Sequence, residues 1–311
     1  MKLNIGYDGI KIYAPYLPVE QALSGMKQEE RSLEELYYIK HKLCTNVVYR
    51  NIAYGEGITI LFNPCLKTAY IKEVPVSILC INADGLTPSM IRDIALRIYG
   101  TLDKLTIAYI ESKVDIDETD FNTIAKNLLV MGKKIAFDKF QGETLYFGKR
   151  TSRNEISLYD KGLQHYGVKD TLIRIEARNR FIKKEQPLLI DFLTGKWRQE
   201  NPFRKTLLIN SEELPLTRNE KISLSKRGLA LFYMNLSKAR KDVLARYFKD
   251  LVTLDLNAVF QQWEEGWLAA NDDPDMTSNQ LEEPISDVAN EGIININQSD
   301  HCNPFARGDD G

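Results

Sequence analysis

The residues best suited to chemistry belong to a stretch of expected strands near the middle of the chain. Residues 171–178 alternate strictly in polarity, which predicts a strand with Arg174, Glu176 and Arg178 on one face. A carboxylate between guanidinium groups is part of what phosphodiester chemistry requires, because guanidinium groups pair well with phosphate oxygens.

An expected β-hairpin precedes this strand. Its arms are the apolar and aromatic runs at residues 144–148 and 155–160, and the segment between them is polar and basic. The second arm carries Glu155, Ser157 and Tyr159 in register with one another. A tyrosine therefore joins the carboxylate and the cations. The alternative is a solvated sheet face with ion pairs, and the pattern by itself favours that alternative.

Carboxylates that could bind a metal ion lie on two expected strands. Asp115 and Asp117 share one face at the end of a strand expected over residues 105–116, and Glu176 lies in the middle of another strand. If these strands are neighbours, the oxygen ligands converge, and such ligands suit Mg²⁺ or Mn²⁺. In the alternative, nearby cations pair with the carboxylates: Lys113, Arg174 and Arg178.

Tyr159 is the candidate nucleophile. The pKa of a tyrosine hydroxyl is near ~10, so attack on phosphorus requires a neighbouring cation that stabilises the phenolate and a metal ion that withdraws charge from the phosphate. Lys161 and Arg153 are the nearest such cations in the sequence. The alternative is an aromatic side chain packed on a sheet, since the chain has 15 tyrosines.

The charge is unevenly distributed along the chain. The net charge is −2, but residues 272–311 hold ten acids and one base, so residues 1–271 carry +7. Within residues 132–205 there are 17 Lys or Arg against 9 Asp or Glu. Basic clusters are often only solvated faces, but a surplus this local indicates a polyanionic partner.

Several classes of protein are disfavoured by what the sequence lacks. It has no run of ~18 apolar residues and no signal-peptide block at its start, so we expect a cytoplasmic protein without a membrane anchor. Its four cysteines have no short paired spacing, which indicates free thiols. With only three histidines besides, a zinc site is not expected. Phosphate-loop, dinucleotide-binding and nucleophile-elbow motifs are absent.

The expected fold is α+β, an antiparallel sheet with helices packed on one side. A small all-helical domain follows, of helix-turn-helix or winged-helix type, with a plain three-helix bundle as the equally good alternative. The expected divisions are an α+β domain, a polar linker, the helical domain and an acidic disordered tail, at residues 1–200, 201–216, 217–270 and 271–311.

The order of these features resembles rolling-circle replication initiators. A helix opened by Leu-Thr-Pro is followed by a strand ending Lys-Val-Asp-Ile-Asp, a helix, the Tyr-Phe-Gly hairpin, Ile-Ser-Leu-Tyr-Asp-Lys and Arg-Ile-Glu-Ala-Arg. The hairpin is similar to that of staphylococcal plasmid initiators, and the last strand is similar to the gene II replication protein of filamentous phages. The resemblance covers residues 76–251 and is densest over 105–180.

This resemblance implies a nicking-joining enzyme with an initiator- or relaxase-like catalytic domain. Such an enzyme binds a double-stranded origin, cleaves one strand through a tyrosine and stays attached to the 5′ phosphate in the single-stranded product. A helicase and a polymerase of a bacterial host complete replication. The carried-over metal ligands are Asp115 and Glu176, to which Asp117 is added from its strand face. The catalytic residues expected beside them are Tyr159, Lys161 and Arg174. The expected DNA-binding residues are Lys149, Arg150, Arg153, Arg178, Arg180, Lys183 and Lys184.

The chain departs from the family at two places. Lys113 stands where the family normally has arginine, and the segment after Arg178 lacks the tyrosine that plasmid initiators place there. Tyr159 matches the tyrosine assigned in the phage family, whereas Tyr233 and Tyr247 are expected to be core residues. The missing tyrosine favours the alternative of a non-catalytic origin-binding or regulatory protein. A third alternative is an interaction protein whose basic sheet meets another acidic partner.

Overall fold

The computed structural model describes residues 2–31, 47–66, 75–117, 119–132, 144–148, 153–169 and 171–270. The sequence also predicts a helix over residues 32–43, from a capping box at Ser32 and Glu35, and a strand or loop over 67–74. Both predictions lie outside the described residues, as do the basic turn with Lys149 and Arg150 and the tail from residue 271. None of the helices within the described residues is long and apolar enough to cross a membrane.

The chain forms two compact units that interleave along the sequence. The first contains residues 1–8, 109–182 and 198–266, and the second contains residues 9–108, 183–197 and those from 267 onward. The long strands β1 (Leu3–Ala14) and β6 (Thr106–Asp117) supply residues to both. The domain boundaries drawn from the sequence stay predictions.

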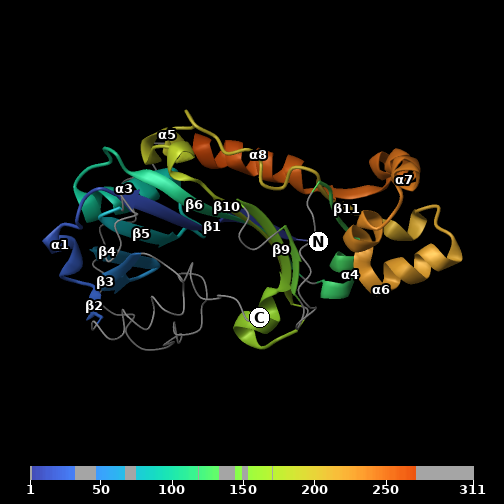
Figure 1. The fold of residues 1–311 in the computed structure, drawn as a ribbon, viewed down its shortest axis with the longest axis horizontal. Coiled ribbons are helices and arrows are strands. Elements are labelled where there is room, and N and C mark those ends of the chain that lie inside the picture. The colour runs from blue at the N-terminus through green and yellow to red at the C-terminus, as the bar shows by residue number, and fades with distance from the viewer. Residues whose placement is uncertain are drawn as a thin grey trace. The chain divides into compact units, whose positions relative to one another are not determined.

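The second unit is built on antiparallel strands in the order β2-β3-β4-β5-β1 (Figure 1). Its elements are β2 (Lys27–Glu30), β3 (Val47–Gly55), β4 (Ile58–Leu66), β5 (Ser77–Asn82), α1 (Glu20–Leu23), α3 (Pro88–Tyr99), α5 (Leu189–Leu193) and a 3-10 turn (Lys183–Glu185). The sequence predicts a helix over residues 19–27, which is wrong for most of its length because only α1 is helical and β2 follows. It also predicts strands at 46–54, 57–63 and 76–82, and β3, β4 and β5 confirm them.

The helix α3 follows the signals that its sequence carries. The Thr87 hydroxyl accepts a hydrogen bond from the Met90 amide, Pro88 occupies the first helical position, and Gly100 ends the helix at a φ of 70°. Its apolar stripe is buried through Ile91, Ala95 and Ile98. The expected start and end of this helix are therefore confirmed.

The first unit contains the hairpin and the alternating strand that carry Tyr159, Arg174 and Glu176. Its strands are ordered β1-β6-β10-β9-β8, with β8 at Thr144–Phe147, β9 at Asn154–Asp160 and β10 at Leu172–Arg180. The central strand β10 pairs antiparallel with both β6 and β9. A π-helical turn (Gly162–Tyr166) follows β9. The expected hairpin and the alternating strand after it are confirmed.

The apolar back of these strands is covered by α8 (Leu256–Ala269). The Tyr7 ring packs edge-on against Phe260 and Trp263, and its hydroxyl donates a hydrogen bond to Glu264. Burial and the Glu264 charge raise the pKa of Tyr7 well above its usual value. The helix thereby closes one face of the sheet and leaves the charged residues on the other.

A smaller three-stranded sheet completes the first unit, in the order β12-β11-β7. Its elements are β7 (Leu128–Val130), β11 (Thr206–Ile209), β12 (Val252–Asp255), α4 (Phe121–Asn127), α6 (Arg218–Met234), α7 (Lys238–Leu251) and a 3-10 turn (Ser211–Glu213). Three expectations are corrected here. The sequence predicts a helix over residues 121–131, but the helix α4 ends at Asn127 and residues 128–130 form the strand β7. The strand β11 lies within the segment expected to be a polar linker, and β12 interrupts the segment expected to be all-helical. In each case strand pairing outweighs the local pattern.

Candidate active site

One face of the strands β6, β10 and β9 carries the candidate site. Arg174 lies opposite Asp115 on β6 and Tyr159 on β9, and Glu176 lies opposite Lys113 and Ser157. Directly paired residues in adjacent antiparallel strands point to the same face, so these side chains are neighbours. We call this surface the charged face, and its members on the three strands are Glu111, Lys113, Asp115, Glu155, Ser157, Tyr159, Arg174, Glu176 and Arg178.

The charged face is buried, which corrects the expectation of a solvated sheet face. Arg174 is only 1 % exposed. Its Nε and Nη2 donate to the two oxygens of Asp115 over 2.6 and 2.8 Å, and its Nη1 lies 2.6 Å from Asp8 Oδ1. Burial by itself would lower the pKa of Arg174, but these carboxylates outweigh it and raise that pKa. The arrangement is a bidentate ion pair with a second carboxylate at its edge.

Two lysines approach the same carboxylate. Lys113 Nζ is 3.4 Å and Lys161 Nζ is 3.8 Å from Asp115 Oδ2. Lys161 begins the turn after β9 and is the more exposed of the two. Burial and the Arg174 charge lower the pKa of Lys161. Lys161 is thus a cation that can give up its proton more readily than a solvated lysine.

Tyr159 contacts a carboxylate directly. Its hydroxyl donates a hydrogen bond of 2.8 Å to Glu176 Oε2, and the side chain is 4 % exposed. Burial and the Glu176 charge raise the pKa of Tyr159 well above its usual value. Burial and the Glu111 charge raise the pKa of Glu176 to about 7, against the opposing effect of Arg178. A carboxylate with such a pKa is suited to accept a proton near neutral pH.

Arg178 joins three buried glutamates. Its Nε lies 2.5 Å from Glu176 Oε1 and 2.9 Å from Glu111 Oε1, and its Nη1 lies 3.5 Å from Glu155 Oε1. Tyr109 donates a further hydrogen bond to Glu111. The Arg178 guanidinium therefore holds the Glu176 carboxylate that faces Tyr159. Any contact of Arg178 with DNA would compete with its ion pairs to these three glutamates.

The predicted metal ligands do not fit a divalent cation in this arrangement. Both Asp115 oxygens accept bonds from Arg174, Glu176 contacts Tyr159 and Arg178, and Asp117 lies 3.9 Å from Lys2. Within the described residues no group of three His, Cys, Asp or Glu side chains could hold a metal ion. The ion-paired alternative describes the contacts that these carboxylates make, and the requirement for a divalent cation stays a prediction.

The remaining predicted DNA-binding residues are less enclosed. Arg153 is exposed at the start of β9, and the Arg180 guanidinium lies 5.7 Å from the centre of the Tyr109 ring. Lys183 and Lys184 are exposed in the 3-10 turn of the second unit. Their contacts with DNA stay predictions.

One tyrosine differs from its expected surroundings. Tyr247 was expected to be a core residue but is 44 % exposed, whereas Tyr233 packs against the core of the α6–α7 region as expected.

Asp8 joins the charged face through Arg174, although no motif in the sequence points to it. The alternation of β1 around Tyr7 was the available signal, but only the pairing of strands brings Asp8 to Arg174.

Comparisons with known proteins show a structural likeness but no match in sequence. No protein-family model and no curated protein matches this chain. Among solved structures, the chain is similar to the rolling circle replication initiator protein from Geobacillus stearothermophilus, with a TM-score of 0.36 and 15% sequence identity. The similarity covers 78% of this chain and 97% of that one. A likeness at this level assigns neither a family nor an activity.

Proposed function

We propose that this chain nicks and rejoins one DNA strand to initiate rolling-circle replication, with Tyr159 as the nucleophile. The observation that carries the proposal is the 2.8 Å hydrogen bond from the Tyr159 hydroxyl to the buried carboxylate of Glu176, beside Arg174. A tyrosine with an adjacent base and adjacent cations is the arrangement that phosphodiester transesterification requires. The sequence resemblance to initiators supplies the biological setting.

Proton transfer from Tyr159 to Glu176 activates the nucleophile. The pKa of Glu176 is about 7, so the carboxylate is ionised in a large share of molecules at neutral pH and can accept the hydroxyl proton. The Tyr159 oxygen then attacks phosphorus, and the bond from phosphorus to the 3′ oxygen breaks. The products are a phosphotyrosine at the 5′ end and a free 3′ hydroxyl.

The cations assist the same step in two ways. Arg174 neutralises charge that develops on the phosphate oxygens, because guanidinium groups bind such oxygens tightly. Lys161 donates the proton that the leaving 3′ oxygen needs, and its lowered pKa makes this donation easier. Lys161 suits this role because its Nζ is 3.8 Å from Asp115, beyond direct hydrogen-bond distance. Rejoining reverses both proton transfers.

The test is formation of a covalent protein–DNA adduct. Full-length protein is incubated with labelled single-stranded oligonucleotides of random sequence, and adducts are resolved on denaturing gels. We expect adducts with the unmodified chain and a loss of at least ~10³-fold with Tyr159→Phe. Parallel reactions with EDTA and with Mg²⁺ or Mn²⁺ test the divalent-cation prediction separately.

The matched control is Tyr146→Phe, since Tyr146 on β8 lies opposite Ser157 on the same sheet. That variant should form adducts at the rate of the unmodified chain. Adducts that survive Tyr159→Phe would assign the nucleophile to another residue. Absence of adducts from the unmodified chain under all conditions would reject the nicking function.

A second candidate function is DNA binding without catalysis. The observation that favours it is the burial of Tyr159 at 4 % exposure, together with internal carboxylate partners for Arg174 and Arg178. Under this alternative the chain binds a replication origin but leaves its strands intact. Specific duplex binding without any adduct would select it. In either function the partners proposed are origin DNA and the helicase and polymerase of a bacterial host, in its cytoplasm.

A further inference from the structure

The helix α6 is broken, and the break creates a three-helix arrangement. Gly228 has a φ of 72° and a ψ of 164°, so α6 consists of helical segments at residues 218–227 and 229–234. A Cβ at this position would lie 2.5 Å from the Ala125 carbonyl oxygen, so only glycine fits there. The backbone of α6 thus turns where it meets α4, and both lie together in Figure 1.

A short turn leads from the broken helix into α7. Asn235 closes α6 by donating from Nδ2 to the Leu231 carbonyl, and Ser237 caps α7 by accepting from the Arg240 amide. Three residues, 235–237, therefore separate the segment 229–234 from α7. Two helices joined by a turn of this length form a helix-turn-helix arrangement.

The three helical segments share one apolar core. Leu224, Leu229 and Phe232 of α6 pack with Leu244 and Phe248 of α7. The core also contains residues of β7 and β11 and of the segment before α6: Leu129, Ile209 and Leu214. Burial of Leu244 and Phe248 fixes the rotation of α7 about its axis, so the opposite side of this helix faces outward.

The outward side of α7 has the chemistry of a surface that reads duplex DNA. Val243 is 38 % and Tyr247 is 44 % exposed, one helical turn apart, and the exposed Arg246 lies beside them. Apolar groups can contact thymine methyl groups and arginine can bind guanine in the major groove. Residues 217–251 contain nine Lys or Arg against three Asp or Glu. This positive surplus favours a polyanion as the partner over an ordinary protein surface.

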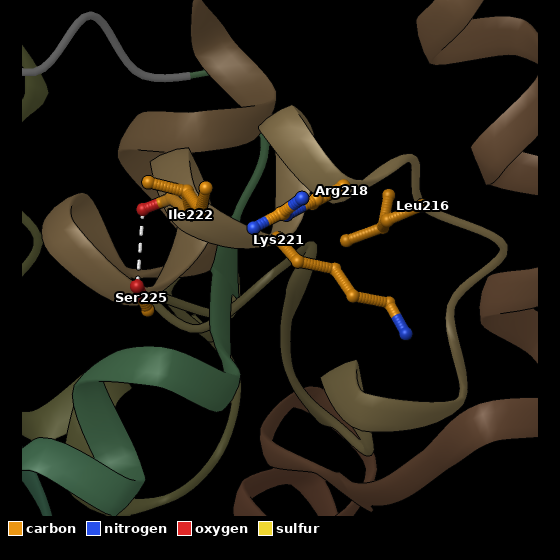
Figure 2. A pocket seen from close by; sticks show the side chains of 5 residues that line it. All are labelled: Leu216, Arg218, Lys221, Ile222 and Ser225. Atoms are coloured by element: carbon orange, nitrogen blue, oxygen red, sulfur yellow. Dashed lines mark hydrogen bonds between the residues drawn. The ribbon is translucent and has the colours of Figure 1, made fainter.

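A pocket beside the start of α6 adds cations next to α7. It has a volume of about 480 Å³ and is lined by Leu216, Arg218, Lys221, Ile222 and Ser225. Figure 2 shows Arg218 and Lys221 extending from the same part of α6. Arg240, in the first turn of α7, donates to Glu220 over 2.8 Å and to the Pro215 carbonyl over 2.6 Å. The first turns of α6 and α7 are thereby held together.

We propose that α7 enters the major groove of duplex DNA and reads its sequence, while Arg218 and Lys221 contact a flanking phosphate. A helix of 14 residues is about 21 Å long and fits this groove. This inference names the origin-recognition surface of the proposed initiator and rests on that function for the choice of partner. It does not depend on strand cleavage.

The experiment is enrichment of binding sequences from a pool of random duplex DNA by the full-length chain. Affinities for an enriched duplex and a scrambled duplex are then measured by fluorescence anisotropy, in a Tyr159→Phe background that cannot form an adduct. The double change Arg246→Gln with Tyr247→Ala should weaken binding to the enriched duplex at least ~10-fold and weaken the scrambled duplex less.

The matched control is Leu96→Ala with Arg97→Gln on α3, because Leu96 is 37 % exposed and Arg97 is also exposed. This control should stay within twofold of the parent. Arg218→Gln with Lys221→Gln should weaken both duplexes equally and reduce the salt dependence of binding. Circular dichroism and unfolding midpoints confirm that each variant folds.

Three outcomes would overturn the proposal. They are the absence of any enriched sequence, parental affinity in the α7 variant, and an equal loss on both duplexes from that variant. Parental affinity would assign the exposed residues of α7 to a protein partner instead. Failure of the nicking function is seen separately, as absence of adducts from a chain that still binds the enriched duplex.

Discussion

The charged face of the sheet and the outward side of α6 and α7 are both rich in arginine and lysine, but they hold these charges differently. On the charged face, Arg174 is buried between Asp115 and Asp8. On α6 and α7, Arg218 and Arg246 are exposed to solvent. The first surface fixes each charge through a buried partner, whereas the second leaves charges available to an external one.

Buried charges suit proton transfer, whereas exposed charges suit the binding of a partner. Burial, together with neighbouring charges, raises the pKa of Glu176 and lowers the pKa of Lys161. Exposed charges attract a polyanion through the solvent, and salt screens this attraction. The proposed nicking of DNA at a chosen sequence would use both kinds of surface, which both belong to the first unit.

The largest expected difference between the two surfaces is in stability. Arg174→Ala should lower the free energy of unfolding by about 3–5 kcal/mol, because it leaves Asp115 buried without its bidentate partner. Arg218→Ala, on the exposed surface, should change it by less than ~0.5 kcal/mol. Denaturant unfolding measures both. Similar losses in the two variants would show that the charged face is solvated in solution.

A pH series sharpens the role of Glu176. Its pKa is about 7 in the folded chain against an ordinary value of 4.5, so the folded state holds this proton more tightly. The resulting stabilisation is complete below pH 4.5 and is lost as the pH rises through 7. Glu176→Gln removes this titration. The difference in unfolding free energy between the two proteins should change by up to ~3 kcal/mol between pH 4.5 and 8. Parallel pH curves would contradict the raised pKa.

The break in α6 can be tested with a pair of glycines. Gly228→Ala should lower the free energy of unfolding by about 1–3 kcal/mol, because the new Cβ meets Ala125 O at 2.5 Å and the φ of 72° suits only glycine. Gly266→Ala, in α8, meets nothing within 4 Å and should be neutral or stabilising by up to ~1 kcal/mol. A neutral Gly228→Ala would mean that α6 can straighten, which would remove the helix-turn-helix arrangement.

The smallest expected effect concerns the acidic end of the chain. Deleting residues 272–311 removes a charge of −9 and changes the net charge from −2 to +7. Affinity for random duplex DNA should rise a few-fold at low salt and converge with that of the full chain at high salt. Anisotropy titrations at two salt concentrations measure this. Unchanged affinity at low salt would reject a role of these residues in limiting non-specific binding.

Local sequence rules predicted elements where propensity and tertiary contacts agree. The spacing Thr217-x-x-Glu220 predicts a capping box at the start of α6, and both of its reciprocal hydrogen bonds are present; the N-cap of α3 at Thr87 also forms. The rules failed where strand pairing decided the outcome. Residues 128–130 read as the end of a helix but become β7, because β11 supplies the pairing partners, with Leu208 opposite Leu128 although the two are 80 positions apart.

The alternation of polar and apolar residues is enough to assign which side chains share a face of a strand. Strict alternation sufficed to put Arg174, Glu176 and Arg178 together, and to align Glu155 with Tyr159, because side chains alternate in any extended strand. The local basic surplus and the acidic end of the chain can also be read from the sequence.

The contacts that those side chains make depend on how strands far apart in the sequence pair with one another. The register of β6 against β10 sets Asp115 opposite Arg174 instead of opposite Glu176, and β1 brings in Asp8 from the start of the chain. A shift of one residue in this register would reverse the face, and a shift of two would exchange partners. Register depends on packing across strands distant in sequence, so the ion pairs that Asp115 and Glu176 make could not be read from the alternation of either strand alone.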